Sequence, residues 1–75
     1  MQRQPVTSSN IKSIGLEGSM LEVEFASGSV YQYSGERAAA HFAAMQAADS
    51  VGTYFAKNVR NDKSLQTKRV EGAGT

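Results

Sequence analysis

The residues that could carry out acid–base or nucleophilic chemistry are few. His41 is the single histidine, and the 75-residue sequence contains no cysteine. A histidine that acts as a general base needs a nucleophile and an orienting carboxylate. Ser34 and Glu36 are near His41 in the sequence, but neither spacing is characteristic of a catalytic triad. We therefore expect His41 to be a surface or half-buried side chain, and we expect no metal site built from cysteines or a histidine cluster.

Two carboxylates could form an acid–base pair. Glu22 and Glu24 lie in a segment with strand-like alternation, which places both on one face about 7 Å apart. Such a pair works when burial or a neighbouring charge separates the two pKa values, and the sequence indicates neither. We interpret these glutamates as a solvated sheet face. The glycines form neither a P-loop nor a dinucleotide fingerprint, so we predict a non-enzymatic protein with no cofactor.

Basic residues are concentrated in the last third of the chain. Residues 1–49 contain three basic and five acidic residues, whereas residues 50–75 contain five basic and two acidic residues. Lys57 and Arg60 are three residues apart and would share a helix face, with Lys63 following if the helix continues. Such a stripe can contact phosphates. The same residues would also favour a helix C-terminus through its dipole and improve solubility.

Tyr31 and Tyr33 form the second candidate binding feature. Aromatic side chains on a sheet can stack on nucleic-acid bases, or they can line the core with their hydroxyls at the sheet edge. The face occupied by Leu21, Val23 and Phe25 decides between these alternatives. Since the sequence is short of large apolar side chains, we favour the core.

The elements that must position these residues begin with strands. Apolar residues alternate with polar ones in residues 20–25 and again in 30–33, and residues 11–16 have the composition of a third strand. The segments 17–19 and 27–29 each contain a glycine suited to a tight turn. The pattern predicts a three-stranded antiparallel meander.

The following segment indicates two helices. Residues 36–48 contain seven alanines, the strongest helix former, and Ser34 or Gly35 could supply the N-cap. Ser50 would cap a second helix that runs through Val59. We predict an α+β fold of order βββαα, in which two short helices cover one face of the sheet and Phe42 and Met45 cover its apolar side chains.

These elements predict one domain over residues 8–63, between a flexible N-terminus at 1–7 and a disordered tail at 64–75. Neither end has enough apolar residues to offset the entropy of ordering it. The sequence contains no run near the roughly 18 apolar residues that a membrane span needs, and residues 1–10 contain no apolar stretch typical of a secretory signal. We therefore expect no membrane partner and a cytoplasmic location.

The arrangement of these residues resembles the KTSC domain, a small domain found at the C-terminus of some lysyl-tRNA synthetases and as free-standing bacterial and phage proteins. The central feature is Tyr31-x-Tyr33, followed by Ser50-x-Gly52-x-Tyr54-Phe55. The other matching residues are Ser8, Ser9, Ile11, Ile14, Gly15, Leu21, Val23, Phe25, Gly28, Ala48, Val59 and Arg60. The resemblance implies the fold predicted above and, for function, RNA binding.

Two functions follow as hypotheses. The first is a binding module for RNA or another nucleic acid that contacts phosphates through Lys57, Arg60 and Lys63, with Tyr31 or Tyr33 stacking on bases. The alternative is a phage or bacterial protein-interaction module, an adaptor or inhibitor of a larger host or phage complex. The acidic face with Glu22 and Glu24 and the unpaired sheet edges could serve that purpose, or could form a homodimer.

Overall fold

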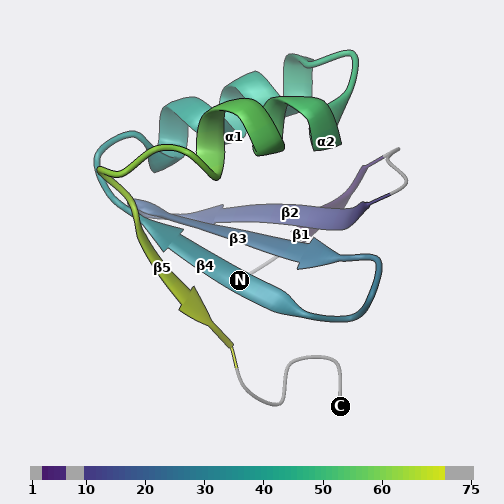
Figure 1. Cartoon of the computed structure of the whole chain (residues 1–75), viewed down its shortest axis with the longest axis horizontal. Helices are drawn as coiled ribbons and strands as arrows, with labels where there is room; N and C mark the ends of the chain where they lie inside the picture. Colours follow the sequence, from purple (N-terminus) through teal and green to yellow (C-terminus); the bar gives the residue numbers. More distant parts are fainter. Residues whose placement is uncertain (1–2, 7–9, 71–75) are drawn as a thin grey trace.

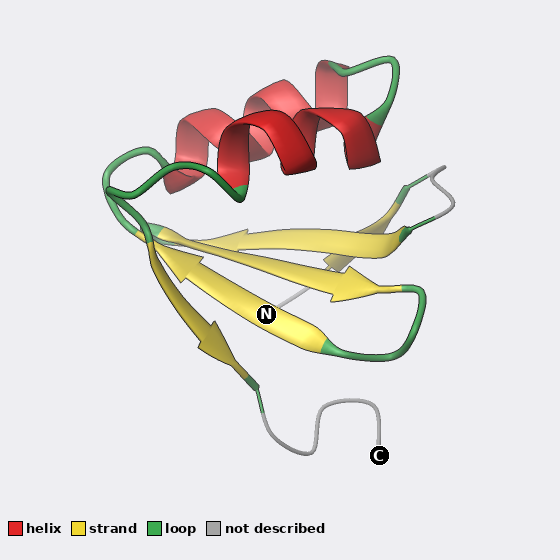
Figure 2. Ribbon diagram, viewed as in Figure 1, coloured by secondary structure: helices red, strands yellow, loops and turns green. Residues whose placement is uncertain are grey.

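The computed structural model describes residues 3–6 and 10–70, and these form one sheet with helices on one side (Figure 1; Figure 2). The elements in chain order are β1 (Arg3–Pro5), β2 (Ile11–Glu17), β3 (Met20–Phe25), β4 (Val30–Ser34), α1 (Ala38–Ala47), α2 (Val51–Tyr54), the π-helical turn η1 (Phe55–Val59) and β5 (Gln66–Arg69). The sheet is antiparallel throughout, in the order β1-β2-β3-β4-β5. Within the described ranges, no helix has the length and apolar character that a membrane crossing requires.

The register of the central strands places the apolar residues on the helix-covered face. Leu21 pairs with Tyr33, and Val23 pairs with Tyr31. Directly paired residues of an antiparallel sheet share a face, so both tyrosines lie on the face of Leu21 and Val23. The predicted hairpins are present, and Gly18 and Gly28 have φ values of 60° and 96° in their turns, a region that glycine adopts without steric cost.

The prediction of three strands was wrong, because the sheet has five. The outer strands β1 and β5 come from the two segments that we expected to be flexible or disordered. Their pairing rests on backbone hydrogen bonds, which need no apolar side chain, and a buried Leu65 anchors the start of β5. The remaining residues of those segments at 1–2, 7 and 71–75 lie outside the described residues, as does the expected domain boundary at residue 8.

The two helices occupy the predicted segments, but α1 starts later than predicted. The N-cap of α1 is Arg37, without a side-chain hydrogen bond, so the expectation of a Ser34 or Gly35 cap was wrong. Ser34 is instead the last residue of β4. The Ser50 cap of α2 is present, because the Ser50 Oγ accepts a hydrogen bond of 3.3 Å from the Thr53 backbone N–H.

The second helix widens into a π-helical turn after Tyr54. The Arg60 N–H donates to the Phe55 carbonyl oxygen at 2.9 Å, an i to i+5 bond. The Asn61 side chain donates to the carbonyl oxygens of Ala56 and Lys57 and thereby holds the end of this turn. A π-turn changes the angle between successive side chains, which separates residues that would share a face of a regular helix.

The core lies between the sheet and the helices. Ile14, Leu21, Val23 and Met45 are fully buried within it, so the expected cover by Met45 is present. Phe42 and Phe25 pack against this core but are only half-buried. Phe25 is therefore a boundary side chain and not the central core residue that the alternation predicts.

Candidate functional site

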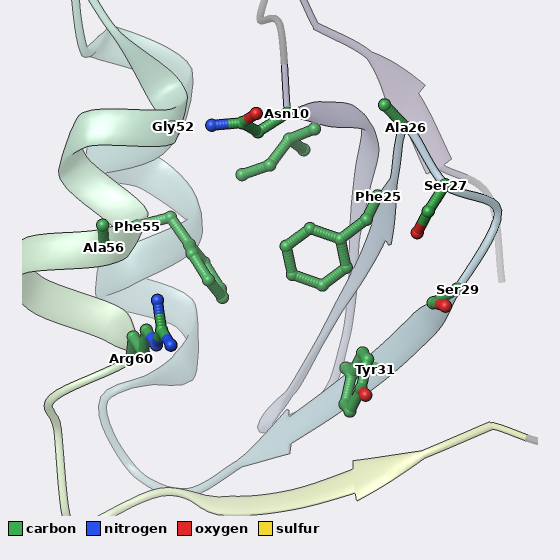
Figure 3. A pocket seen from close by; sticks show the side chains of 11 residues that line it. Asn10, Phe25, Ala26, Ser27, Ser29, Tyr31, Gly52, Phe55, Ala56 and Arg60 are labelled. Carbon is green, nitrogen blue, oxygen red and sulfur yellow. The ribbon is translucent and has the colours of Figure 1, made fainter.

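An open cavity of about 500 Å³ lies where the end of β3 and the start of β4 face α2 and η1. Figure 3 shows the Phe25 and Tyr31 rings on the strand side and the Phe55 and Arg60 side chains on the helix side. Gly52 and Ala56 line the helix wall, where their small size leaves the space open. We call this site the aromatic cavity, defined by Phe25, Tyr31, Phe55 and Arg60.

The rings of the aromatic cavity belong to a continuous cluster. The Phe25 ring is edge-to-face with those of Tyr31 and Phe55, with centroid separations of 5.7 Å and 5.3 Å. Tyr33 extends the cluster beneath the cavity, with its centroid 5.4 Å from Phe55 and 6.5 Å from Tyr31. These edge contacts fix the ring orientations. Because Phe25 and Tyr31 are only half-buried, part of each ring is exposed in the cavity.

Tyr33 is buried, whereas Tyr31 is half-buried. Both lie on the core face, as we favoured, but only Tyr31 lines the aromatic cavity. Burial and, to a lesser extent, the nearby Tyr31 hydroxyl raise the pKa of the Tyr33 hydroxyl, Arg60 lowers it, and the net pKa is about 12. Tyr33 therefore stays uncharged at neutral pH and supports the cavity floor, and Arg60 provides positive charge at the same place.

The predicted stripe of Lys57, Arg60 and Lys63 is divided between two sites. Arg60 lines the aromatic cavity, while Lys57 and Lys63 line a separate cavity of about 450 Å³ together with Arg37, Asn58 and Asn61. The three residues of the predicted stripe therefore do not line one site: Lys57 lies within η1, and Arg60 directly follows it. We call the second site the basic cavity, defined by Arg37, Lys57 and Lys63.

His41 and Asp62 also line the basic cavity. His41 is buried, so the expectation of a surface or half-buried side chain was wrong. Its Nδ1 is 3.0 Å from the Tyr54 hydroxyl, and its Nε2 is 2.8 Å from Asp62 Oδ2. The histidine thus has both an hydroxyl and a carboxylate partner, from residues 13 and 21 positions away.

Asp62 is a fully engaged carboxylate. Its Oδ1 accepts hydrogen bonds from the Ser64 backbone N–H at 2.9 Å and from the Ser64 hydroxyl at 2.6 Å. The hydrogen bond from His41, followed by those from Ser64, holds the pKa of Asp62 well below its usual range. Asp62 is therefore ionised at neutral pH, and its carboxylate oxygens are hydrogen-bonded to His41 and Ser64.

Glu22 and Glu24 have partners that the sequence did not indicate. Arg3 Nη1 is 3.1 Å from Glu22, and Arg3 Nη2 is 3.9 Å from Glu24. Gly15 lies between Arg3 and Glu22 in the register and has no side chain to separate them. The interpretation as a solvated face without a charge partner was wrong, because it depended on the absence of β1. Among the described residues, no group of three potential ligands could hold a metal ion.

Phe25, Phe55 and Arg37 were not among the predicted binding residues. Phe25 was assigned to the core by its alternation, and Phe55 was noted only as half of the Tyr54-Phe55 pair. An aromatic at a strand end could have indicated incomplete burial. Nothing in the sequence pairs Arg37 with Lys57 or Lys63, because α1 and η1 meet only in the folded chain.

Comparison with known proteins places this geometry in a family. The chain is similar to the crystal structure of a KTSC domain protein from Yersinia pestis, at 32% identity and a TM-score of 0.81 over 92% of this chain and 96% of that one. No protein with curated annotation matches the sequence. The family model for the KTSC domain matches residues 7–62, and the chain therefore belongs to the KTSC domain family.

Proposed function

We propose that the protein is a non-enzymatic, cytoplasmic module that binds single-stranded RNA at the aromatic cavity. The observation that carries the proposal is that the half-buried Tyr31 ring and the Arg60 guanidinium line one open cavity, Tyr31 from the strand side and Arg60 from the helix side (Figure 3). Stacking on an aromatic ring contributes about 1–3 kcal/mol per base and tolerates every base. A guanidinium nearby can contact the phosphate of the same nucleotide.

The size and charge of the site support this ligand. A cavity of about 500 Å³ falls within the range of roughly 300–1,000 Å³ typical of small-ligand pockets, which is room for a base and its sugar. Arg69 pairs with Tyr31 in the sheet and adds a second exposed cation beside the cavity. We expect binding that depends little on sequence and weakens with salt.

Fluorescence anisotropy with labelled single-stranded RNA, single-stranded DNA and duplex RNA at several salt concentrations tests the proposal. We expect Tyr31→Ala to weaken single-stranded RNA binding by about tenfold or more, whereas Tyr31→Phe retains the stacking surface and most of the affinity. Arg60→Gln should lower the salt slope by about one unit.

The matched control is Lys68→Gln, which removes a cation from the polar face of the sheet, where Lys68 pairs with Gln32. Thermal melting of each variant establishes that it is folded. Single-stranded RNA binding that is absent at low salt, or that is equally sensitive to Lys68→Gln and Arg60→Gln, would contradict the proposal.

An edge strand favours protein interaction as the second candidate. β5 forms one edge of the sheet, and all four of its side chains are exposed. A strand from an acidic partner, or from a second copy of this chain, could pair with that edge next to Lys68 and Arg69. A pull-down from host lysate with and without nuclease separates the candidates, because RNA-mediated capture is lost after nuclease treatment and direct protein capture is retained.

A further inference from the structure

We propose that the basic cavity is a binding site for a dianionic phosphate group. Arg37 precedes α1, Lys57 lies in η1, and Lys63 lies in the turn after η1, and the fold brings these three cations to one cavity of about 450 Å³. The inference is independent of RNA binding at the aromatic cavity, because the two cavities share no lining residue.

The positive charge of the basic cavity is not neutralised by ion pairs. Within residues 3–6 and 10–70, ion pairs join Arg3 to Glu22 and Glu24, His41 makes a hydrogen bond with Asp62, and no ion pair involves Arg37, Lys57 or Lys63. Arg37 interacts electrostatically with Asp62 but forms no ion pair with it. Cations that face one space repel one another, and an anion that binds between them relieves that repulsion.

Asp62 lowers the net positive charge of the basic cavity, but the charge of the cavity stays positive. Both oxygens of Asp62 are occupied, Oδ2 by His41 and Oδ1 by Ser64. Its side chain is only 9% exposed, and neither Lys57 nor Lys63 forms an ion pair with it. The three cations and this carboxylate give a formal charge of +2, which complements the roughly −1.5 to −2 carried by a phosphate monoester at pH 7.

Neutral donors complete the chemistry of the site. Asn58 and Asn61 line the cavity, and their amides are held by hydrogen bonds to backbone carbonyl oxygens of the helix. An amide nitrogen carries two hydrogens. Asn58 donates one of them to the Tyr54 carbonyl oxygen, so the other can be donated to a ligand. Lysine ammonium groups and an amide on a fixed turn are a combination suited to phosphate oxygens.

The test is a titration of the ¹⁵N-labelled full chain, followed by NMR, with inorganic phosphate at constant ionic strength set by sodium chloride. At pH 7.5, we expect saturable shifts of the amides near Arg37, Lys57 and Lys63, and much weaker effects of dimethyl phosphate, which carries one charge. Lys57→Gln and Lys63→Gln should each weaken phosphate binding by about tenfold. The matched control Lys68→Gln should leave it unchanged.

Further arms identify the source of the phosphate. Shifts caused by a 5′-phosphorylated oligonucleotide but not by its 5′-hydroxyl counterpart assign the site to a nucleic-acid end, and shifts caused by inorganic phosphate alone assign it to the free ion. Phosphate binding that persists in Tyr31→Ala separates this inference from the proposed RNA site. Non-saturating shifts spread over the surface, or equal losses in Lys57→Gln and Lys68→Gln, would overturn it.

Discussion

His41 has one arrangement of protons that satisfies both of its ring nitrogens while it is neutral. Nε2–H donates to Asp62, and Nδ1 accepts from the Tyr54 hydroxyl. His41 lies in α1, Tyr54 in α2 and Asp62 after η1, so this side chain joins three parts of the helical layer. The bonds also position Asp62 for its contacts with Ser64, directly before the buried Leu65.

Asp62 makes the protein less stable in acid. Because its pKa is lowered in the folded state, its stabilising contribution is present above the pKa of the unfolded chain, about 4, and is lost as pH falls below that value. We expect Asp62→Asn to be less stable than the parent at pH 7 and to lose less stability between pH 5 and pH 2. Urea unfolding across this range measures the effect. Asp49→Asn is the exposed control, and an acid profile of Asp62→Asn parallel to that of the parent would contradict the assignment.

Tyr33 makes the protein less stable in alkali, whereas Asp62 makes it less stable in acid. Its pKa is raised to about 12 in the folded state, so its contribution is present below the unfolded value of about 10 and is lost as pH rises from 10 to 12. We expect Tyr33→Phe to flatten the alkaline decline of stability, as measured by urea unfolding between pH 9 and pH 12. An alkaline decline of Tyr33→Phe parallel to that of the parent would contradict the role of burial.

At the scale of the elements, the connection from β4 to α1 lies directly against the chain that leads into β5. A Cβ added at Gly35 would lie 3.0 Å from Leu65 Cδ2 and 3.0 Å from the Ser64 carbonyl oxygen. The Gly35 N–H donates to the Ser19 carbonyl oxygen at 3.0 Å, which restricts its movement. The glycine thus allows three segments far apart in sequence to meet at one end of the sheet (Figure 1).

Gly35→Ala should destabilise the protein by about 1–3 kcal/mol, because the added methyl group overpacks against a backbone oxygen that cannot rotate away. Thermal or urea unfolding measures the loss. The control is Ser27→Ala in an exposed turn, which should change stability by less than about 0.5 kcal/mol. An unfolding midpoint of Gly35→Ala equal to that of the parent would show that the neighbouring segment moves freely.

At the scale of the whole molecule, the two outer strands extend the sheet beyond the part that carries the core. β1 supplies Arg3 to the carboxylates of β3, and β5 follows the buried Leu65 and pairs with β4 from Tyr31 to Ser34. Both ends of the described chain therefore contribute to the sheet that supports the aromatic cavity.

Removal of residues 64–75 should destabilise the protein by at least about 2 kcal/mol, since it deletes a buried leucine as well as a strand. Unfolding curves of this truncation and of one that removes only residues 71–75 provide the comparison, and the shorter deletion serves as the control. Equal stability of the two truncated proteins would mean that Leu65 and β5 contribute nothing to the fold.

The sequence alone determined the features that depend on near neighbours along the chain. Alternation in 20–25 and 30–33 predicted β3 and β4, glycines predicted the two turns, and Ser50 predicted the cap of α2, because each feature depends on residues within a few positions. The matching Tyr31-x-Tyr33 and Ser50-x-Gly52-x-Tyr54-Phe55 patterns also identified the family correctly.

Only the tertiary structure decided the outer strands and the composition of both cavities. β1 and β5 have no apolar pattern of their own, and they exist because β2 and β4 offer backbone groups for pairing. Arg60 and Lys57 line different cavities although they are three residues apart, and the partners of His41 lie 13 and 21 residues away. Long-range contacts of this kind are set by packing of distant segments, which a local pattern of residues does not encode.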